Sequence, residues 1–162
     1  MYNPSMDPAF NLITRCAFDA PASAVWRETV DVIAYPEWWP AVKSVTIHGE
    51  EPSLRQGSEV SYIIRGFLPH ALKFQTVVTV CQPFSRIEMR ATGDLRGVGI
   101  STLEEQGNRT LATFQWQVEL MPPVLRRLNQ WRLFQRLFAW NHDSTMRHAI
   151  KNMKARVEHA HL

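Results

Sequence analysis

The stretch APASAVWRETVDVIAYPEWWPAV (residues 20–42) decides the fold, because it ends a helix and reverses the chain within a few residues. Pro21 suits the first turn of a helix. The apolar residues that follow recur at helical spacing: Ala22, Val25, Trp26 and Val30. Pro36 and Pro40 then limit residues 35–39 to one short helical turn. The stretch therefore predicts two short helices and a reversal that contains two adjacent tryptophans.

Segments typical of strands flank this stretch on both sides. Before it, residues 10–18 alternate, with Phe10, Leu12, Cys16 and Phe18 on one side. After it come six strand-like segments: residues 42–49, 57–67, 72–82, 86–92, 94–105 and 109–120. Their short connections predict a meander, and so one antiparallel sheet.

The C-terminal region reads as a single long helix. No glycine or proline occurs from Val124 to about Ala160. At about 1.5 Å per residue, an unbroken helix there would be roughly 50 Å long. Its apolar positions form a stripe: Leu128, Trp131, Phe134, Leu137, Phe138, Met146, Ile150, Met153 and Val157. We expect an α+β fold in which a curled antiparallel sheet of about six to seven strands wraps around this helix, with two short helices after strand 1.

Length and charge narrow the possible classes of protein. The 162 residues suit one domain, which we expect over residues 9–162, behind a flexible tail of residues 1–8. No apolar run is long enough for a membrane span and the start is not typical of a secretory signal, so we expect a cytoplasmic protein. The net charge of +3 is uneven, because residues from Val124 onward include eight Arg and Lys but two acidic residues. Such a basic helix suits transient contact with an anionic membrane surface, or is simply a solvated helix face.

Other kinds of site receive little support. Cys16 and Cys81 have no metal-binding spacing, so we expect reduced thiols and no metal site. The Gly97–Gly99 pair lacks the third glycine of a dinucleotide loop, and we expect no cofactor. The sequence lacks the interleaved basic and aromatic residues that are typical of nucleic-acid binding, so we expect no nucleic-acid partner. The sequence does not indicate an oligomeric state.

A cavity is one interpretation of the middle of the sheet. Gly97 and Gly99 fall on the inward side of their strand, opposite the long helix, and either keep space open or let the chain pack closely or bend. On the helix, Asn141, His142 and Thr145 interrupt an apolar stripe, as polar groups do in small-molecule pockets. The candidate ligand-binding residues are Tyr62, Phe74, Met89, Gly97, Gly99, Trp116, Phe138, Asn141, His142 and Met146.

His142 is the candidate acid or base, because the pKa of an unperturbed histidine lies near neutrality. The alternative is a histidine that donates a hydrogen bond to a strand backbone, or that lies at the helix surface beside Asp143. Tyr62 is a weaker second candidate. A single ionisable group facing the cavity favours binding over catalysis.

The order of these motifs resembles the START-like helix-grip superfamily (SRPBCC) in its polyketide cyclase/dehydrase branch. The resemblance rests on the opening stretch of residues 20–42 and on three later ones, TGDLRGVGISTLEE, GNRTLATFQWQVEL and FAWNHDSTMRHAIKNMKARV. It implies a helix-grip fold with an apolar tunnel that holds a lipid, quinone, polyketide or aromatic molecule. It also implies an alternative, a polyketide cyclase or dehydratase that uses His142 as acid or base. Binding is the preferred hypothesis.

The resemblance also suggests a role for the doubled tryptophan. Rings of Trp38 and Trp39 would plug the gap between the turn and the open end of the curled sheet, as a lid at one mouth of the cavity. Alternatively, they anchor the two short helices to the sheet.

Overall fold

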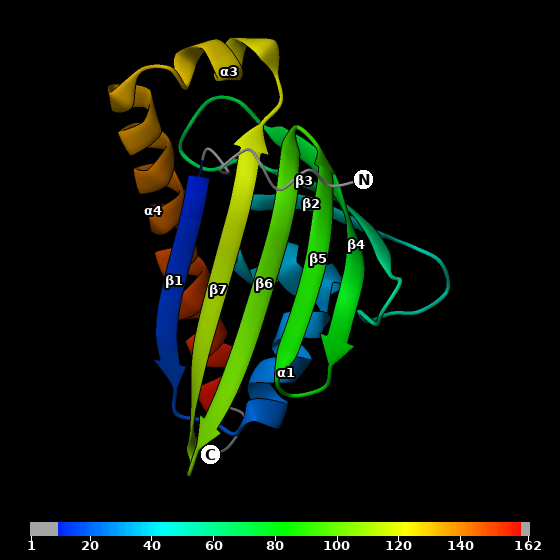
Figure 1. Ribbon diagram of the computed structural model, residues 1–162. Helices are drawn as coiled ribbons and strands as arrows, with labels where there is room; N and C mark the ends of the chain where they lie inside the picture. Colours follow the sequence, from blue (N-terminus) through cyan, green and yellow to red (C-terminus); the bar gives the residue numbers. More distant parts are fainter. Residues whose placement is uncertain (1–9, 160–162) are drawn as a thin grey trace.

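A curled seven-stranded antiparallel sheet forms the body of the computed structural model, which describes residues 10–159 (Figure 1). The strands are β1 (Phe10–Phe18), β2 (Val42–His48), β3 (Glu59–Ile64), β4 (Leu72–Gln82), β5 (Arg86–Gly93), β6 (Leu95–Gln106) and β7 (Arg109–Leu120). Their order across the sheet is β1-β7-β6-β5-β4-β3-β2. Strands β2 to β7 thus form the expected meander, and β1 pairs with β7 at the far edge. The predicted tail of residues 1–8 lies outside the described residues.

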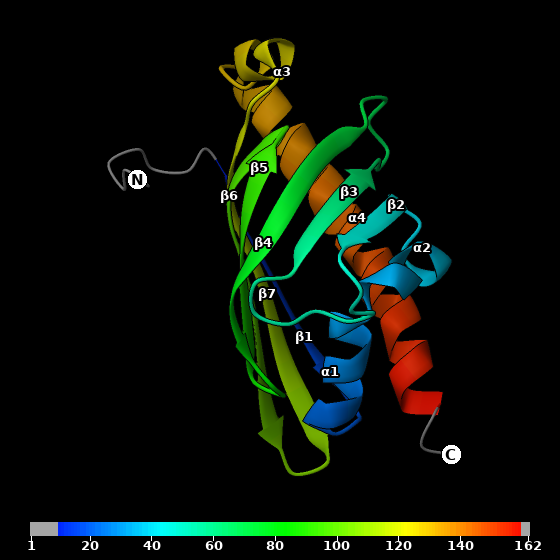
Figure 2. The same cartoon turned by 90° about the vertical axis from the view of Figure 1, so that its right-hand side faces the viewer.

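Helices cover one face of this sheet (Figure 2). On this face lie α1 (Ala22–Val30), the 3-10 turn η1 (Val32–Ala34), α2 (Tyr35–Trp38) and α4 (Arg132–His159), while α3 (Pro123–Leu128) lies at the end of the sheet. The predicted α+β class and the short helices after β1 are confirmed. No helix within residues 10–159 combines the length and apolar character that a membrane crossing requires.

The core lies between the concave face of the sheet and the helices. Alternate residues of β4 are buried, namely Phe74, Thr76 and Val78, while the residues between them are exposed. The side chains of Val60, Ile87 and Val118 on other strands are almost fully buried. This period of two is what a strand with one buried face requires.

The C-terminal helix is broken, which the sequence did not predict. α3 ends at Leu128, and α4 begins at Arg132 after a turn in which Trp131 N–H donates to the Leu128 carbonyl. The chain leaves β7 across the end of the sheet and must then turn to run along the concave face (Figure 1). One straight helix could not follow both directions, so the long-helix prediction holds only for α4.

The break also changes the apolar stripe. Phe138, Met146, Met153 and Val157 are buried as expected. Trp131 and Leu137, which the helical spacing assigned to the same stripe, are exposed. Trp131 belongs to the turn rather than to α4, and so an unbroken helical period does not apply to it.

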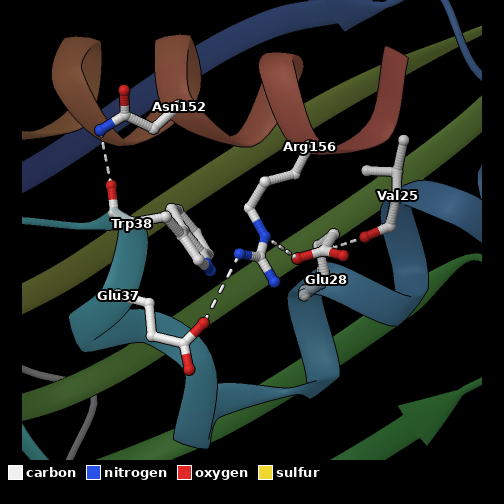
Figure 3. Close-up of polar contacts among 7 residues, drawn as sticks. Val25, Glu28, Glu37, Trp38, Asn152 and Arg156 are labelled. Atoms are coloured by element: carbon white, nitrogen blue, oxygen red, sulfur yellow. Dashed lines mark hydrogen bonds and ion pairs between the residues drawn. The ribbon is translucent and has the colours of Figure 1, made fainter. Parts of the chain in front are cut away.

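Polar contacts fasten α1 and α2 to the end of α4 (Figure 3). The side-chain amide of Asn152 donates to the Trp38 carbonyl at 2.6 Å. The Arg156 guanidinium lies 2.7 Å from the Glu28 carboxylate and 3.6 Å from that of Glu37. These contacts fix where the tryptophan turn sits relative to the long helix.

At Gly97 the backbone conformation and the close approach of β7 require glycine. The residue does not form the wall of a cavity. Its φ is +154°, and a Cβ atom there would lie 1.9 Å from the Gln117 carbonyl oxygen on β7. At Gly99 the nearest atoms to an added Cβ are side-chain atoms of Met89 and Trp116, at 3.1 Å. The two inward glycines therefore serve different purposes.

The contrast predicts different costs for adding a methyl group. Gly97→Ala is expected to lower the free energy of unfolding by about 3 kcal/mol, because the strain and the clash involve backbone that cannot move aside. Gly99→Ala is expected to cost less than about 1 kcal/mol, since a flexible methionine and a ring edge can shift. Urea unfolding of both variants measures the difference, and equal costs would contradict this account of β6.

Candidate functional site

A cavity of about 180 Å³ lies between the concave face of the sheet and α4. Strand side chains form one wall, and the helices together with the β3–β4 loop (residues 65–71) form the rest. An engineered cavity of roughly 150 Å³ accommodates benzene, so this volume suits a molecule of one or two rings. The wall is mainly aromatic and aliphatic.

Nine of the ten sequence-predicted residues line this cavity: Tyr62, Phe74, Met89, Gly99, Trp116, Phe138, Asn141, His142 and Met146. Gly97 does not, because its missing side chain would point into the β7 backbone. Several of these rings contact one another. The Phe74 ring lies 5.3 Å from Tyr62 and 6.1 Å from Trp116 between centroids. Whether these residues bind a ligand is still a prediction.

Trp38 and Trp39 also line the cavity, at the end where α2 meets α4. Their rings are stacked with centroids 6.1 Å apart, and Tyr35 packs against both. The Tyr35 hydroxyl donates to the Thr29 carbonyl. The tryptophan turn is therefore anchored, which agrees with the interpretation that it holds the short helices in place. It also lies at one end of the cavity, which agrees with the interpretation of a lid. Neither tryptophan was among the candidate ligand-binding residues, although the doubled tryptophan had suggested a lid at one mouth of the cavity.

Both indole N–H groups are buried without a hydrogen-bond partner among the residues that the structure describes. An unpaired buried donor is costly, and native proteins rarely leave one. An oxygen acceptor would satisfy each of these two donors.

His142 on α4 contributes a different polar group. Its Nε2 atom is buried and has no partner within residues 10–159, and its Nδ1 atom lies 3.4 Å from the Asp143 carboxylate. Burial lowers the pKa of His142, although Asp143 acts in the opposite direction. The imidazole is therefore neutral at pH 7. When Nδ1 carries the proton and donates it to the Asp143 carboxylate in a hydrogen bond, Nε2 is left as a hydrogen-bond acceptor.

Asn141 holds the β3–β4 loop. Its side-chain oxygen accepts from Phe67 N–H at 2.7 Å and from Leu68 N–H at 3.3 Å. Gly66 permits this approach, because a Cβ there would lie 2.6 Å from the same oxygen. The carbonyl of Asn141 is thus already used by the loop, which adds Leu68 and His70 to the cavity wall. The sequence could not reveal this contact, which joins residues more than 70 positions apart.

The ionisable side chains among the described residues of the wall are Tyr35, Tyr62, His70 and His142. Among the described residues that line it there is no Asp, Glu, Lys or Arg. Burial raises the pKa of Tyr35 and of Tyr62, so both phenols keep their protons. Within residues 10–159, no three His, Cys, Asp or Glu side chains gather as metal ligands would. Cys16 and Cys81 are free thiols, and burial raises the pKa of Cys16 to about 11.

Solved structures with the same fold come from several bacteria. A Thermus thermophilus protein is 18% identical, with a TM-score of 0.73 over 93% of this chain and 99% of its own. A START superfamily protein of Mycobacterium smegmatis is 19% identical, with a TM-score of 0.67 over 93% and 98%. The ZhuI aromatase/cyclase of a Streptomyces species is 13% identical, with a TM-score of 0.68 over 92% and 93%. At these low identities, the structural similarity shows a shared fold and no more.

A search of curated proteins returns no match. The profile of the family described as "Polyketide cyclase / dehydrase and lipid transport" matches residues 14–158, nearly the whole chain. This match agrees with the START-like helix-grip architecture that the strands and α4 build. The chain therefore belongs to the polyketide cyclase/dehydrase and lipid transport family.

Proposed function

We propose that this protein binds an uncharged apolar molecule of aromatic, quinone or polyketide type in the cavity between the sheet and α4. The observation that carries the proposal is the uncharged wall with its few unpaired polar groups. Apolar walls with a few convergent polar groups are typical of small-molecule sites. A charged ligand would lose its hydration there and gain no counter-ion, which is costly.

The positions of the polar groups suggest how such a ligand lies. Trp38 is fixed at the level of Asn152 on α4, ten residues beyond His142. A carbonyl oxygen of the ligand would accept from the indole N–H groups, and a hydroxyl elsewhere would donate to His142 Nε2. Such a ligand is uncharged and bears oxygen at more than one position.

Catalysis by a cyclase or dehydratase is the second candidate, and one observation favours it. His142 is neutral, buried and unpaired at Nε2 within the described chain, as a general base should be. It would take a proton from the ligand, and the protonated Tyr62 phenol on the sheet side of the cavity would donate one. No carboxylate on the described wall assists them, so binding is preferred.

A matched ligand pair tests the uncharged wall. We expect 1,4-naphthoquinone to bind at least about tenfold more tightly than 2-naphthoate at pH 7, because the carboxylate must be desolvated. Quenching of tryptophan fluorescence measures both affinities. Equal or stronger binding of the carboxylate would contradict the proposal.

Filling the cavity should abolish that binding. Ala149 is buried on α4 and lines the cavity, whereas Ala155 is exposed on the same helix. Ala149→Phe is expected to weaken naphthoquinone binding by tenfold or more, while Ala155→Phe leaves it unchanged. Circular dichroism checks that both variants are folded. Unchanged binding by a folded Ala149→Phe would place the ligand elsewhere.

The depressed pKa of His142 predicts a pH dependence of stability. Its folded pKa lies below the unfolded value of about 6.5, so the unfolded chain takes up the proton first as the pH falls. The contribution of His142 to the free energy of unfolding is thus fully present above pH 6.5. It is lost as the pH falls through the pKa of His142 in the folded protein. Urea unfolding at pH 7.5 and pH 5 should show a smaller loss for His142→Gln than for the wild type. Equal losses would mean that His142 is not desolvated.

A further inference from the structure

Large apolar side chains gather on the outer surface of α3, of the following turn and of the first half of α4. More than half of the exposed large hydrophobic residues in the described chain belong to this region or touch it: Phe67, Val124, Trp131, Leu133, Leu137 and Trp140. Leu133 is 78% exposed and Trp131 67% exposed. We call these six residues, with Arg126, Arg127, Arg132 and Arg136, the α3–α4 surface.

The apolar residues form a ridge rather than a scatter. Leu133, Leu137 and Trp140 are four and three positions apart, so they lie on one side of α4. The Phe67 ring lies 5.7 Å from the Trp140 ring between centroids and extends the ridge onto the β3–β4 loop. Isolated exposed apolar residues are ordinary, but a continuous ridge marks an interaction site.

The charge of this surface has one sign. Four arginines and no acidic residue occur from Pro123 to His142. None of these arginines forms an ion pair with a carboxylate in the part of the chain that the structure describes. The second half of α4 provides a comparison, because its exposed positions include His148, Lys151 and Ala155 and no large apolar residue. The ridge is thus a local feature rather than a property of the whole helix.

We infer that the α3–α4 surface docks onto an anionic lipid bilayer. Tryptophan and leucine side chains enter the boundary between headgroups and acyl chains, while neighbouring arginines attract anionic headgroups. A symmetric contact with a second copy would set the unpaired arginines of one surface against those of the other. Nucleic acid would use the arginines but would leave the apolar ridge in water. The bilayer satisfies both parts of the surface.

The same helices border the cavity on their other side. Leu125 of α3 and Phe134 of α4 line it, so docking would bring that end of the cavity to the membrane. The turn between α3 and α4 lets the short helix lie across the end of the sheet (Figure 1). This inference stands on the surface itself and does not depend on which ligand binds.

Flotation with vesicles tests the inference. The wild type is expected to bind vesicles of phosphatidylcholine with about 30% phosphatidylglycerol, at about 0.1 M salt, and to bind pure phosphatidylcholine at least tenfold less. Binding should fall at about 0.5 M salt, because salt screens the arginines. Each basic residue near such a surface contributes about a fivefold factor, so Arg132→Gln with Arg136→Gln should weaken binding roughly thirtyfold.

Apolar variants and matched controls complete the design. Leu133→Ser with Trp140→Ser should weaken vesicle binding tenfold or more. Ile13→Ser with Leu111→Ser, two exposed residues of β1 and β7, should not change it. Naphthoquinone binding is measured on every variant, so failure of docking is distinguished from failure of the proposed cavity function.

Three outcomes would overturn the inference. One is no preference of the wild type for anionic vesicles. Another is an equal loss of vesicle binding in the surface variants and the sheet controls. The third is self-association or nucleic-acid binding that depends on this surface in the absence of vesicle binding.

Discussion

The concave face of the sheet is wider than the single long helix that covers it, and the rest of the structure follows from this mismatch. α4 packs against β1, where the rings of Phe10 and Phe138 lie 4.5 Å apart. A cavity is left between α4 and the strands from β3 to β7. The structure closes it with small elements: α2 at one end, the β3–β4 loop along the side, and α3 near the other end. Each needs its own tether, and Asn152 and Asn141 on α4 provide two of them.

The chemistry of the cavity follows from the same arrangement. Because the closing elements contribute aromatic and aliphatic side chains, His70 and backbone, the described wall contains no Asp, Glu, Lys or Arg. Burial keeps His142 neutral and the two tyrosines protonated, which preserves that neutrality near pH 7. The unpaired indole groups and His142 Nε2 are then the polar contacts most in need of a partner. A neutral, oxygen-bearing apolar molecule satisfies this set better than an ion does.

Most of the fold could be predicted from local patterns, because the alternation of β4 and β7 and the apolar spacing of α4 report directly on burial. The break at residues 129–131 could not, since no proline or glycine marks it and the end of the sheet alone requires the change of direction. In the site, the period of each element placed nine of the ten candidate residues on the cavity wall, and their binding of a ligand stays a prediction. Gly97 does not line the cavity, because alternation gives the side on which a residue lies but not its φ. The contact of Asn141 with the β3–β4 loop depends on tertiary structure, which a sequence period does not contain.

Native mass spectrometry of the protein as purified, followed by organic extraction, tests the central claim most directly. The account predicts a single bound small molecule that is uncharged at neutral pH and that Ala149→Phe no longer retains. A protein isolated empty should instead acquire one neutral aromatic ligand on incubation. Contradiction would come from a protein that retains only an anionic molecule, or from an empty protein that takes up no neutral aromatic ligand.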